Sequence, residues 1–118
     1  MNTVTLEVRS LADTLTDVAA AMETLTPAAP RISFETLELL WKVLTVKRWQ
    51  LIEALTGAGP VTIREAARRV QRDVKAVHGD VHALLAAGVL EKSDDGRIVF
   101  PYDAVHVDFT VQPEGVAA

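Results

Sequence analysis

The segment that constrains the fold most is residues 61–100, where signals for two short helices, a tight turn and a β-hairpin follow one another. Thr62 and Glu65 form a capping box, in which a hydroxyl and a carboxylate three residues later satisfy free backbone donors at a helix start. This signal predicts a short helix over residues 63–70.

A second helix follows almost at once. Asp73 can cap its start, and Gly88 stands where a glycine usually ends a helix. Only Gln71 and Arg72 separate the two helices, and a connection of this length holds paired helices at a steep angle. The apolar residues of the second helix recur with helical spacing and indicate the face that packs on the core: Val74, Val77, Val81, Leu84 and Leu85.

A β-hairpin is predicted next. Residues 89–92 and 97–100 are strand-like runs, and the pair Asp95-Gly96 in their connection is a strong hairpin signal. Helix, turn, helix and hairpin in this order are typical of a winged helix-turn-helix. Such a motif sets its second helix, the reading helix, in the major groove of DNA, with the hairpin, the wing, beside it. The sequence thus predicts an α+β, mainly helical protein built on this motif.

The rest of the chain predicts a helical scaffold with a strand at each end. Residues 3–9 and 102–111 alternate between apolar and polar side chains, as half-buried strands do. Further helices are bounded by caps or by proline and glycine: about Leu11 to Leu25 after Ser10, about Phe34 to Val43, and a third after Thr45 that runs to Leu55. Trp41 and Trp49 stand at helical spacing among leucines, so we expect both to be core anchors rather than ligand-binding residues.

The two end strands each need a partner, since an unpaired strand edge invites aggregation. They can pair within one chain or across a two-fold axis. We expect a homodimer, because DNA-binding proteins of this kind usually bind paired half-sites; a monomer with an intrachain sheet is the alternative. The chain then divides into an N-terminal strand and helix for dimerisation or partner binding, a DNA-binding domain, and a C-terminal strand and tail: residues 1–30, 31–101 and 102–118.

Charge is distributed unevenly along the chain. The 118 residues carry a formal net charge of −4, which argues against a protein that coats nucleic acid through bulk positive charge. Residues 41–82, however, hold eight basic and four acidic side chains, a local charge of +4. A local patch, rather than the total charge, is what neutralises phosphates; the alternative is that these cations are only the solvated faces of helices.

Composition excludes several classes of protein. The chain has no cysteine, which excludes disulfides and thiolate metal sites and agrees with a reducing compartment. No apolar run approaches the roughly 20 residues that cross a bilayer, and the N-terminus lacks the pattern of a signal peptide, so we expect a cytoplasmic protein. The sequence has no glycine-rich phosphate loop, no nucleophile with its base, and no close pair of carboxylates at a plausible cleft. We therefore expect neither an enzyme nor a cofactor.

Three segments carry a resemblance to a known family: LTVKRWQLIEALTGAGPVTIREAARRV, DVKAVHGDVHALLAAGVLE and DGRIVFPYDAVHVDF. Together they run from residue 44 to residue 109 and resemble predicted winged-helix transcriptional regulators of bacteria and archaea, several of which are described as antitoxin components of toxin-antitoxin pairs. The resemblance implies a repressor, more narrowly an antitoxin that represses its own operon, with a toxin partner bound outside the reading helix. Two positions depart from the general helix-turn-helix pattern: Gln71 stands where glycine is common, and Arg72 where an apolar residue is common.

The residues expected to contact double-stranded DNA fall into three groups. If the apolar face of the second helix packs on the core, the opposite face enters the groove, with Lys75 placed to reach a guanine edge or a phosphate. The arginines at the end of the first helix and in the turn are placed to hold backbone phosphates. The wing adds Arg97, although Asp94 and Asp95 beside it repel DNA. The full expected set is Arg64, Arg68, Arg69, Arg72, Lys75, His78, Gly79, His82 and Arg97.

Gly79 and the histidines admit other interpretations. A glycine inside a helix costs about 1 kcal/mol relative to alanine, so either a close approach of DNA or close helix packing is expected at Gly79. His78 and His82 stand four residues apart, the spacing of zinc ligands, with His106 available as a third. Without a glutamate after His78 and without cysteine, we expect no metal. The alternative to DNA binding altogether is a winged-helix protein-interaction module, favoured by the overall acidity and by the two aspartates of the wing.

Overall fold

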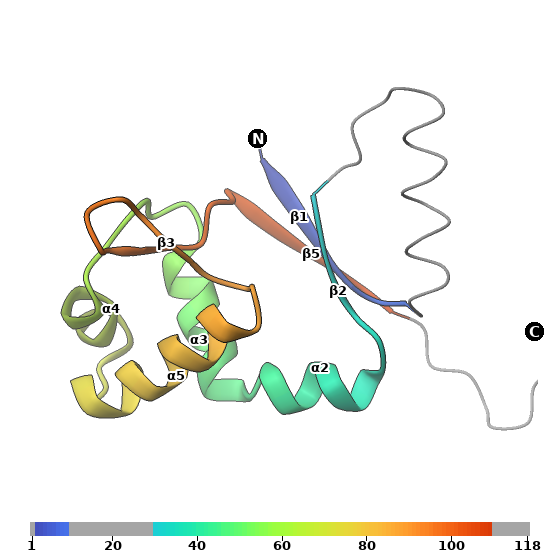
Figure 1. Cartoon of the computed structure of the whole chain (residues 1–118), viewed down its shortest axis with the longest axis horizontal. Helices are drawn as coiled ribbons and strands as arrows, with labels where there is room; N and C mark the ends of the chain where they lie inside the picture. Colours follow the sequence, from blue (N-terminus) through green and yellow to red (C-terminus); the bar gives the residue numbers. More distant parts are fainter. Residues whose placement is uncertain (1, 10–29, 110–118) are drawn as a thin grey trace, which may run out of the picture.

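The computed structural model describes residues 2–9 and 30–109, which form an α+β fold with four helices and two small sheets (Figure 1). The helix predicted from about Leu11 to Leu25 lies outside the described residues. The helices are α2 (Leu37–Val43), α3 (Val46–Leu55), α4 (Ile63–Val70) and α5 (Val74–Ala86), and the strands are β1 (Thr3–Val8), β2 (Arg31–Phe34), β3 (Glu91–Lys92), β4 (Ile98–Val99) and β5 (Ala104–Asp108).

Strands β2, β1 and β5 form a parallel sheet in that order, with β1 in its centre. Leu6 of β1 stands beside Ile32 on one side and Val107 on the other. The two end strands therefore pair within one chain, which was one of the two alternatives. The sheet also draws one strand from each of the three segments into which the sequence divides, so these segments share a common framework.

The start of α2 differs from the sequence prediction, and a strand precedes it. We predicted a helix from about Phe34, but Phe34 is the last residue of β2, and α2 begins at Leu37. Thr36 caps this helix, since its side chain accepts a hydrogen bond from the amide of Leu39 at 3.1 Å. A four-residue strand gives little local signal, and β2 forms because β1 offers a parallel edge to it.

The starts of α3, α4 and α5 were predicted from their caps and are confirmed. Thr45 and Thr62 each accept a hydrogen bond from the backbone amide three residues later, and Asp73 accepts one from the amide two residues later. In the turn between α4 and α5, Gln71 has a φ of 55°, the left-handed conformation that glycine adopts most readily. The turn thus forms with a glutamine in the position where glycine is common.

The hairpin of β3 and β4 is shorter than predicted. Each strand has two residues rather than four, because Val89 and Leu90 are buried in the core ahead of β3. Val61, just before α4, exchanges two backbone hydrogen bonds with Ile98, at 2.9 and 2.8 Å. These bonds tie the start of the helix pair to the hairpin.

The core draws on the three-stranded sheet, all four described helices and the hairpin. Trp49 is partly buried against it, but two predicted core residues are largely outside. Trp41 is 57% exposed, because the seven-residue α2 buries only Leu40. Val74 is 42% exposed, because it is the first residue of α5 and the buried positions of this helix begin at Val77. The prediction of a core position is therefore wrong for Trp41 and Val74.

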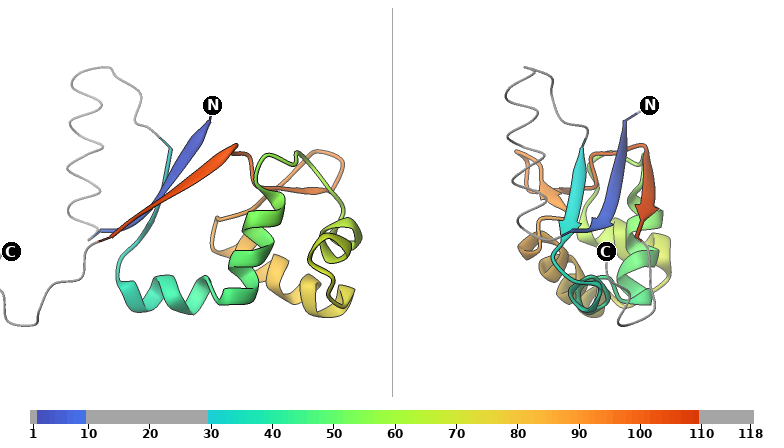
Figure 2. Two further views of the ribbon diagram at one scale, coloured as in Figure 1. Left: turned by 180° about the vertical axis from the view of Figure 1, so that it is seen from behind. Right: turned by 90° about the vertical axis from the view of Figure 1, so that its right-hand side faces the viewer.

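Helix α3 stands between two parts of the molecule (Figures 1 and 2). The three-stranded sheet lies on one side of it, with α2 leading from the sheet to α3. Helix α4 lies on the other side, and α5 runs past α3 and contacts it. Among the described helices, none combines the length and apolar character needed to cross a membrane.

Candidate nucleic-acid interface

Helix α5 has one buried face and one exposed face. Its fully buried side chains are Val77, Val81 and Leu84. The four residues of this helix that we expected to face DNA are all exposed: Lys75, His78, Gly79 and His82. Lys75 and His82 each lie three or four residues from both His78 and Gly79, so the four residues form one stripe along the helix. The predicted division of α5 into two faces is confirmed except at Val74.

The two histidines of this stripe contact each other. Their Nε2 atoms are 3.1 Å apart and their ring centroids 4.2 Å apart. A hydrogen bond between two ring nitrogens needs one N–H donor and one lone pair, so at least one ring is neutral while the bond is present. His106 lies on β5, and no group of three potential metal ligands forms within residues 2–9 and 30–109.

Gly79 has open space beside it. A Cβ built on this residue meets no atom of the described chain within 4 Å, apart from its own helix backbone. The interpretation that this glycine allows close helix packing is therefore wrong. What remains at Gly79 is an accessible stretch of helix backbone in the middle of the exposed stripe.

Helix α4 carries three arginines, and one carboxylate organises two of them. Glu65 accepts hydrogen bonds from Arg68 at 2.5 Å and from Arg69 at 3.1 Å, and these bonds lower the pKa of Glu65 to about 2. Its carboxylate is thus engaged with arginine. Arg68 and Arg69 remain 75% and 38% exposed, and Arg64 is exposed with no ion pair to a described residue.

Arg72 has a different environment from these arginines. Its side chain is only 18% exposed and pairs with Asp80 of α5 at 2.8 Å, and its Nη1 is buried without a hydrogen-bond partner among the described residues. A guanidinium held in this way joins the turn to α5 rather than projecting from the surface. The structure thus separates Arg72 from the other arginines of the expected set.

Asp80 links three elements. Besides Arg72, it accepts a hydrogen bond at 3.1 Å from Arg48 of α3. Burial by itself raises the pKa of Asp80, but hydrogen bonds from Arg72 and Arg48 outweigh it and hold this pKa below its usual value of 3.8. Arg48 also donates to the carbonyl of Val43 at the end of α2. The network fixes α5 on α3, and the sequence gives no local signal for it, because Arg48 lies 32 residues from Asp80.

The hairpin tip offers little free positive charge. Arg97 is 53% exposed and pairs with Asp95 at 3.3 Å. Ser93 donates a hydrogen bond to Asp95, and this bond, followed by one from the Arg97 amide, lowers the pKa of Asp95. Asp94, between them, is exposed and negative.

A comparison with family models covers these same elements. A model of the HVO_A0114 family matches residues 43–107, more than half of the chain. The chain belongs to the HVO_A0114 family. The matched range runs from the end of α2 through α3, α4, α5 and the hairpin into β5, whereas β1 and β2 lie outside it. Comparisons with curated proteins and with solved structures gave no match.

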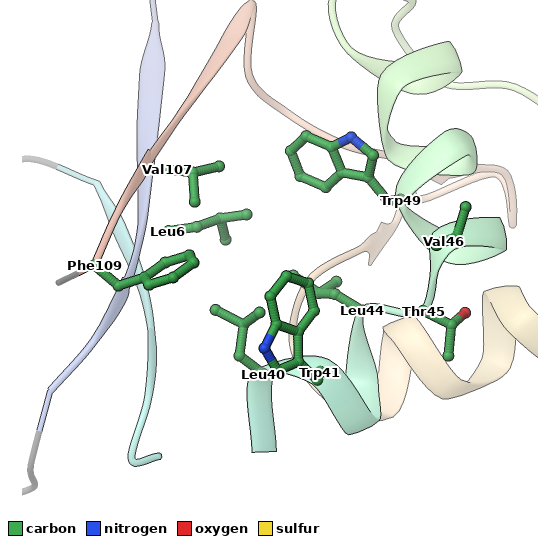
Figure 3. Close-up of a pocket in the computed structure, with 9 residues that line it drawn as sticks. All are labelled: Leu6, Leu40, Trp41, Leu44, Thr45, Val46, Trp49, Val107 and Phe109. Atoms are coloured by element: carbon green, nitrogen blue, oxygen red, sulfur yellow. The ribbon is translucent and has the colours of Figure 1, made fainter. Parts of the chain in front are cut away.

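This member of the HVO_A0114 family also has an apolar cleft of about 580 Å³ between the sheet and helices α2 and α3 (Figure 3). The ring of Trp41 meets that of Phe109 edge to face across it, with centroids 6.2 Å apart. Both tryptophans, expected in the core, are among its lining residues: Leu6, Leu40, Trp41, Leu44, Thr45, Val46, Trp49, Val107 and Phe109. None of the described residues that line it is charged.

Proposed function

We propose that this protein is a sequence-specific DNA-binding transcriptional regulator. In this proposal α4, α5 and the hairpin act as a winged helix-turn-helix, and α5 enters the major groove. The observation that carries the proposal is the exposed stripe on α5, which combines a cation, two hydrogen-bonding rings and an open glycine on a helix that follows α4 after three residues.

The stripe supplies groups suited to base edges. Lys75 lies in the first turn of α5, where its ammonium group can donate to the N7 and O6 acceptors of guanine. His78 and His82 supply ring nitrogens that donate or accept according to protonation. Gly79 between them leaves the helix backbone free to approach the bases.

Phosphate contacts belong to the exposed arginines of α4. Arg64, Arg68 and Arg69 supply cations beside the reading helix, and contacts of this kind fix register on the duplex without reading sequence. Arg72 has another role in this proposal: with Asp80 it holds α5 in place. Arg97 is a minor contact, because Asp95 already neutralises it.

A titration of the protein's own upstream DNA, followed by fluorescence anisotropy at two salt concentrations, tests the proposal. We expect binding at micromolar protein or below that weakens steeply with salt, as phosphate contacts require. Arg68→Ala and Lys75→Ala should each weaken binding. Lys42→Ala, which removes one exposed cation from α2, should leave it unchanged. Absence of binding at low salt, or equal binding by all four proteins, would refute the proposal.

The narrower proposal is an antitoxin that represses its own operon, and it rests on the family resemblance of the sequence alone. Its toxin partner would bind outside α5. Co-expression with the product of the neighbouring gene tests it: a stable complex, together with relief of growth inhibition by that product, is expected. A neighbour that neither binds the protein nor inhibits growth would remove the antitoxin proposal and leave the regulator proposal in place.

A second candidate function is a winged-helix protein-interaction module that does not bind DNA. The observation in its favour is the apolar cleft with the exposed Trp41 at its edge, in a protein with a net charge of −4. The same anisotropy titration separates the two functions, because only the regulator gives salt-dependent binding that Lys75→Ala weakens.

A further inference from the structure

We propose that His78 and His82 form a chelating site for a divalent transition metal ion such as Zn²⁺, and that the bound ion blocks the exposed stripe on α5. The two rings lie one turn apart on the exposed face of α5. No third protein ligand joins them within the described part of the chain. The site is therefore an open one, in which water completes the coordination of the ion.

The distance between the two ring nitrogens suits a shared metal ion. Zinc binds histidine nitrogens at about 2.0–2.1 Å, so two nitrogens that meet on one ion at about 90–110° are about 2.8–3.4 Å apart. The Nε2 atoms of the pair are 3.1 Å apart. Histidines at positions i and i+4 are also the arrangement by which one helix presents two metal ligands. An ion can therefore replace the proton that joins the rings, with each neutral ring keeping its own proton on Nδ1.

The backbone that carries the two rings is held firmly. Val77 and Val81, the residues just before the two histidines, are completely buried. Asp80, between the histidines in sequence, forms ion pairs with Arg48 and Arg72. Because α5 is anchored on both sides of the pair, a metal ion finds its two ligands already in place, and little conformational entropy is lost when it binds.

The ligand type decides the class of ion. Imidazole nitrogen suits Zn²⁺, Ni²⁺ and Cu²⁺, whereas Mg²⁺ and Ca²⁺ prefer oxygen. The carboxylate nearest in sequence is that of Asp80, and its oxygens accept hydrogen bonds from Arg48 and Arg72 instead. Lys75, three residues before His78, adds a positive charge that weakens the attraction of a metal ion. Two neutral ligands beside a cation predict reversible binding of moderate affinity rather than a permanent structural ion.

The position of the site gives the ion its effect on DNA; this step rests on the proposed function. In that proposal both rings form hydrogen bonds with base edges, and a bound ion occupies the same nitrogens. The ion and its waters also stand beside Gly79 on the stripe, where open space lets DNA approach the helix backbone. Metal and DNA therefore compete for one surface, and by linkage each weakens the binding of the other by the same factor.

Titration calorimetry of the full chain with Zn²⁺, without an added histidine tag, tests the site in the absence of DNA. We expect one ion per chain with micromolar affinity. His78→Gln and His82→Gln should each lose at least about tenfold, since removal even of an outer partner of a metal ligand costs about 10–100-fold. His106→Gln is the matched control, because it removes the one other histidine of the chain, an exposed residue of β5, and it should bind Zn²⁺ like the natural protein.

Circular dichroism checks that each of these variants is folded. Absence of Zn²⁺ binding by the natural protein would overturn the inference. Binding that survives intact in folded His78→Gln and His82→Gln, or an equal loss in all three variants, would overturn it as well, because the ion would then be held elsewhere.

Anisotropy with the upstream duplex, with and without Zn²⁺, tests the effect on DNA binding. Saturating Zn²⁺ should weaken DNA binding by the natural protein and by His106→Gln about tenfold, within the usual range of coupling between two sites. The affinity of His78→Gln, whatever its value, should change little when Zn²⁺ is added. An unchanged or stronger affinity of the natural protein in Zn²⁺ contradicts this inference alone. A protein that binds Zn²⁺ at the pair but binds no DNA contradicts the proposed function and leaves the metal site in place.

Discussion

The stripe on α5 and the apolar cleft lie in different parts of the fold and differ in how they are built. The stripe is polar and comes from one helix, so its residues are neighbours in sequence. The cleft is apolar and brings together residues as distant as Leu6 and Phe109. A single helix is therefore enough to present the stripe, whereas the cleft exists only when the sheet packs against α2 and α3.

The network around Asp80 connects the two parts, because it ties α5 to α3. Asp80→Ala should have the largest effect on stability, since it leaves the guanidinium groups of Arg48 and Arg72 partly buried and unpaired. We expect a loss of about 2–3 kcal/mol in the free energy of unfolding, less than for a fully buried pair because water reaches these groups. Urea unfolding measures it. Asp95→Ala, at the exposed hairpin tip, is the control, and an equal loss in both variants would contradict this role of Asp80.

Gly79→Ala should affect stability and DNA binding in opposite directions. Alanine in place of glycine inside a helix stabilises by about 0.5–1 kcal/mol where space is open, and beyond its chain neighbours and its own helix backbone no described atom lies within 4 Å of the added Cβ. The added methyl group should nevertheless weaken DNA binding several-fold by holding the backbone away from the bases. Thermal unfolding and anisotropy measure the two effects. Ala86→Ser, at the exposed last residue of α5, is the control and should leave DNA binding unchanged. Unchanged DNA binding by Gly79→Ala would argue against a close approach of DNA at Gly79.

Arg64→Ala sharpens the comparison on α4. Arg64 has no ion pair with a described residue, whereas Arg68 and Arg69 share Glu65. Its loss should therefore remove a phosphate contact without rearranging neighbours, with a fall in affinity on any sequence and a salt slope reduced by about 1. Anisotropy over a salt series measures both. A loss confined to the operator sequence would mean that Arg64 reads bases instead.

The smallest expected effect is a change in the free energy of unfolding at acidic pH. Because the pKa of Asp80 is held below 3.8 in the folded protein, its ionised form stabilises the fold at higher pH, and that contribution is lost as the pH falls from about 4 through the folded-state pKa. Asp80→Asn should be less stable than the natural protein at pH 6, and the difference should shrink toward pH 3. Unfolding at a series of pH values measures the difference; a constant difference would show that the charge of Asp80 is not involved.

The parts of the molecule that the sequence predicted are those with local causes. Thr45, Thr62 and Asp73 cap their helices through backbone amides two or three residues away, so the helix starts could be identified without any tertiary information. The exposed stripe on α5 followed from the spacing of its apolar residues in the same way.

The parts that were missed depend on distant contacts. β2 exists because β1 lies beside it, and Trp41 is exposed because α2 buries only Leu40. By residue type, Arg72 resembles its neighbours Arg68 and Arg69. Only its ion pair with Asp80 of α5 gives it a different role. Residue type identified these side chains as cations or aromatic groups, but their environment required the folded chain.

The most direct test of the central claim, that the stripe on α5 reads DNA, compares Lys75→Ala with Lys42→Ala on the natural upstream sequence and on a scrambled duplex. Each variant removes one exposed cation, so bulk charge is matched. We expect Lys75→Ala to lose about tenfold in affinity for the natural sequence, as for a good contact to a base edge, and much less for the scrambled duplex, while Lys42→Ala binds both like the natural protein. Equal affinities of the two variants for the natural sequence would contradict the claim.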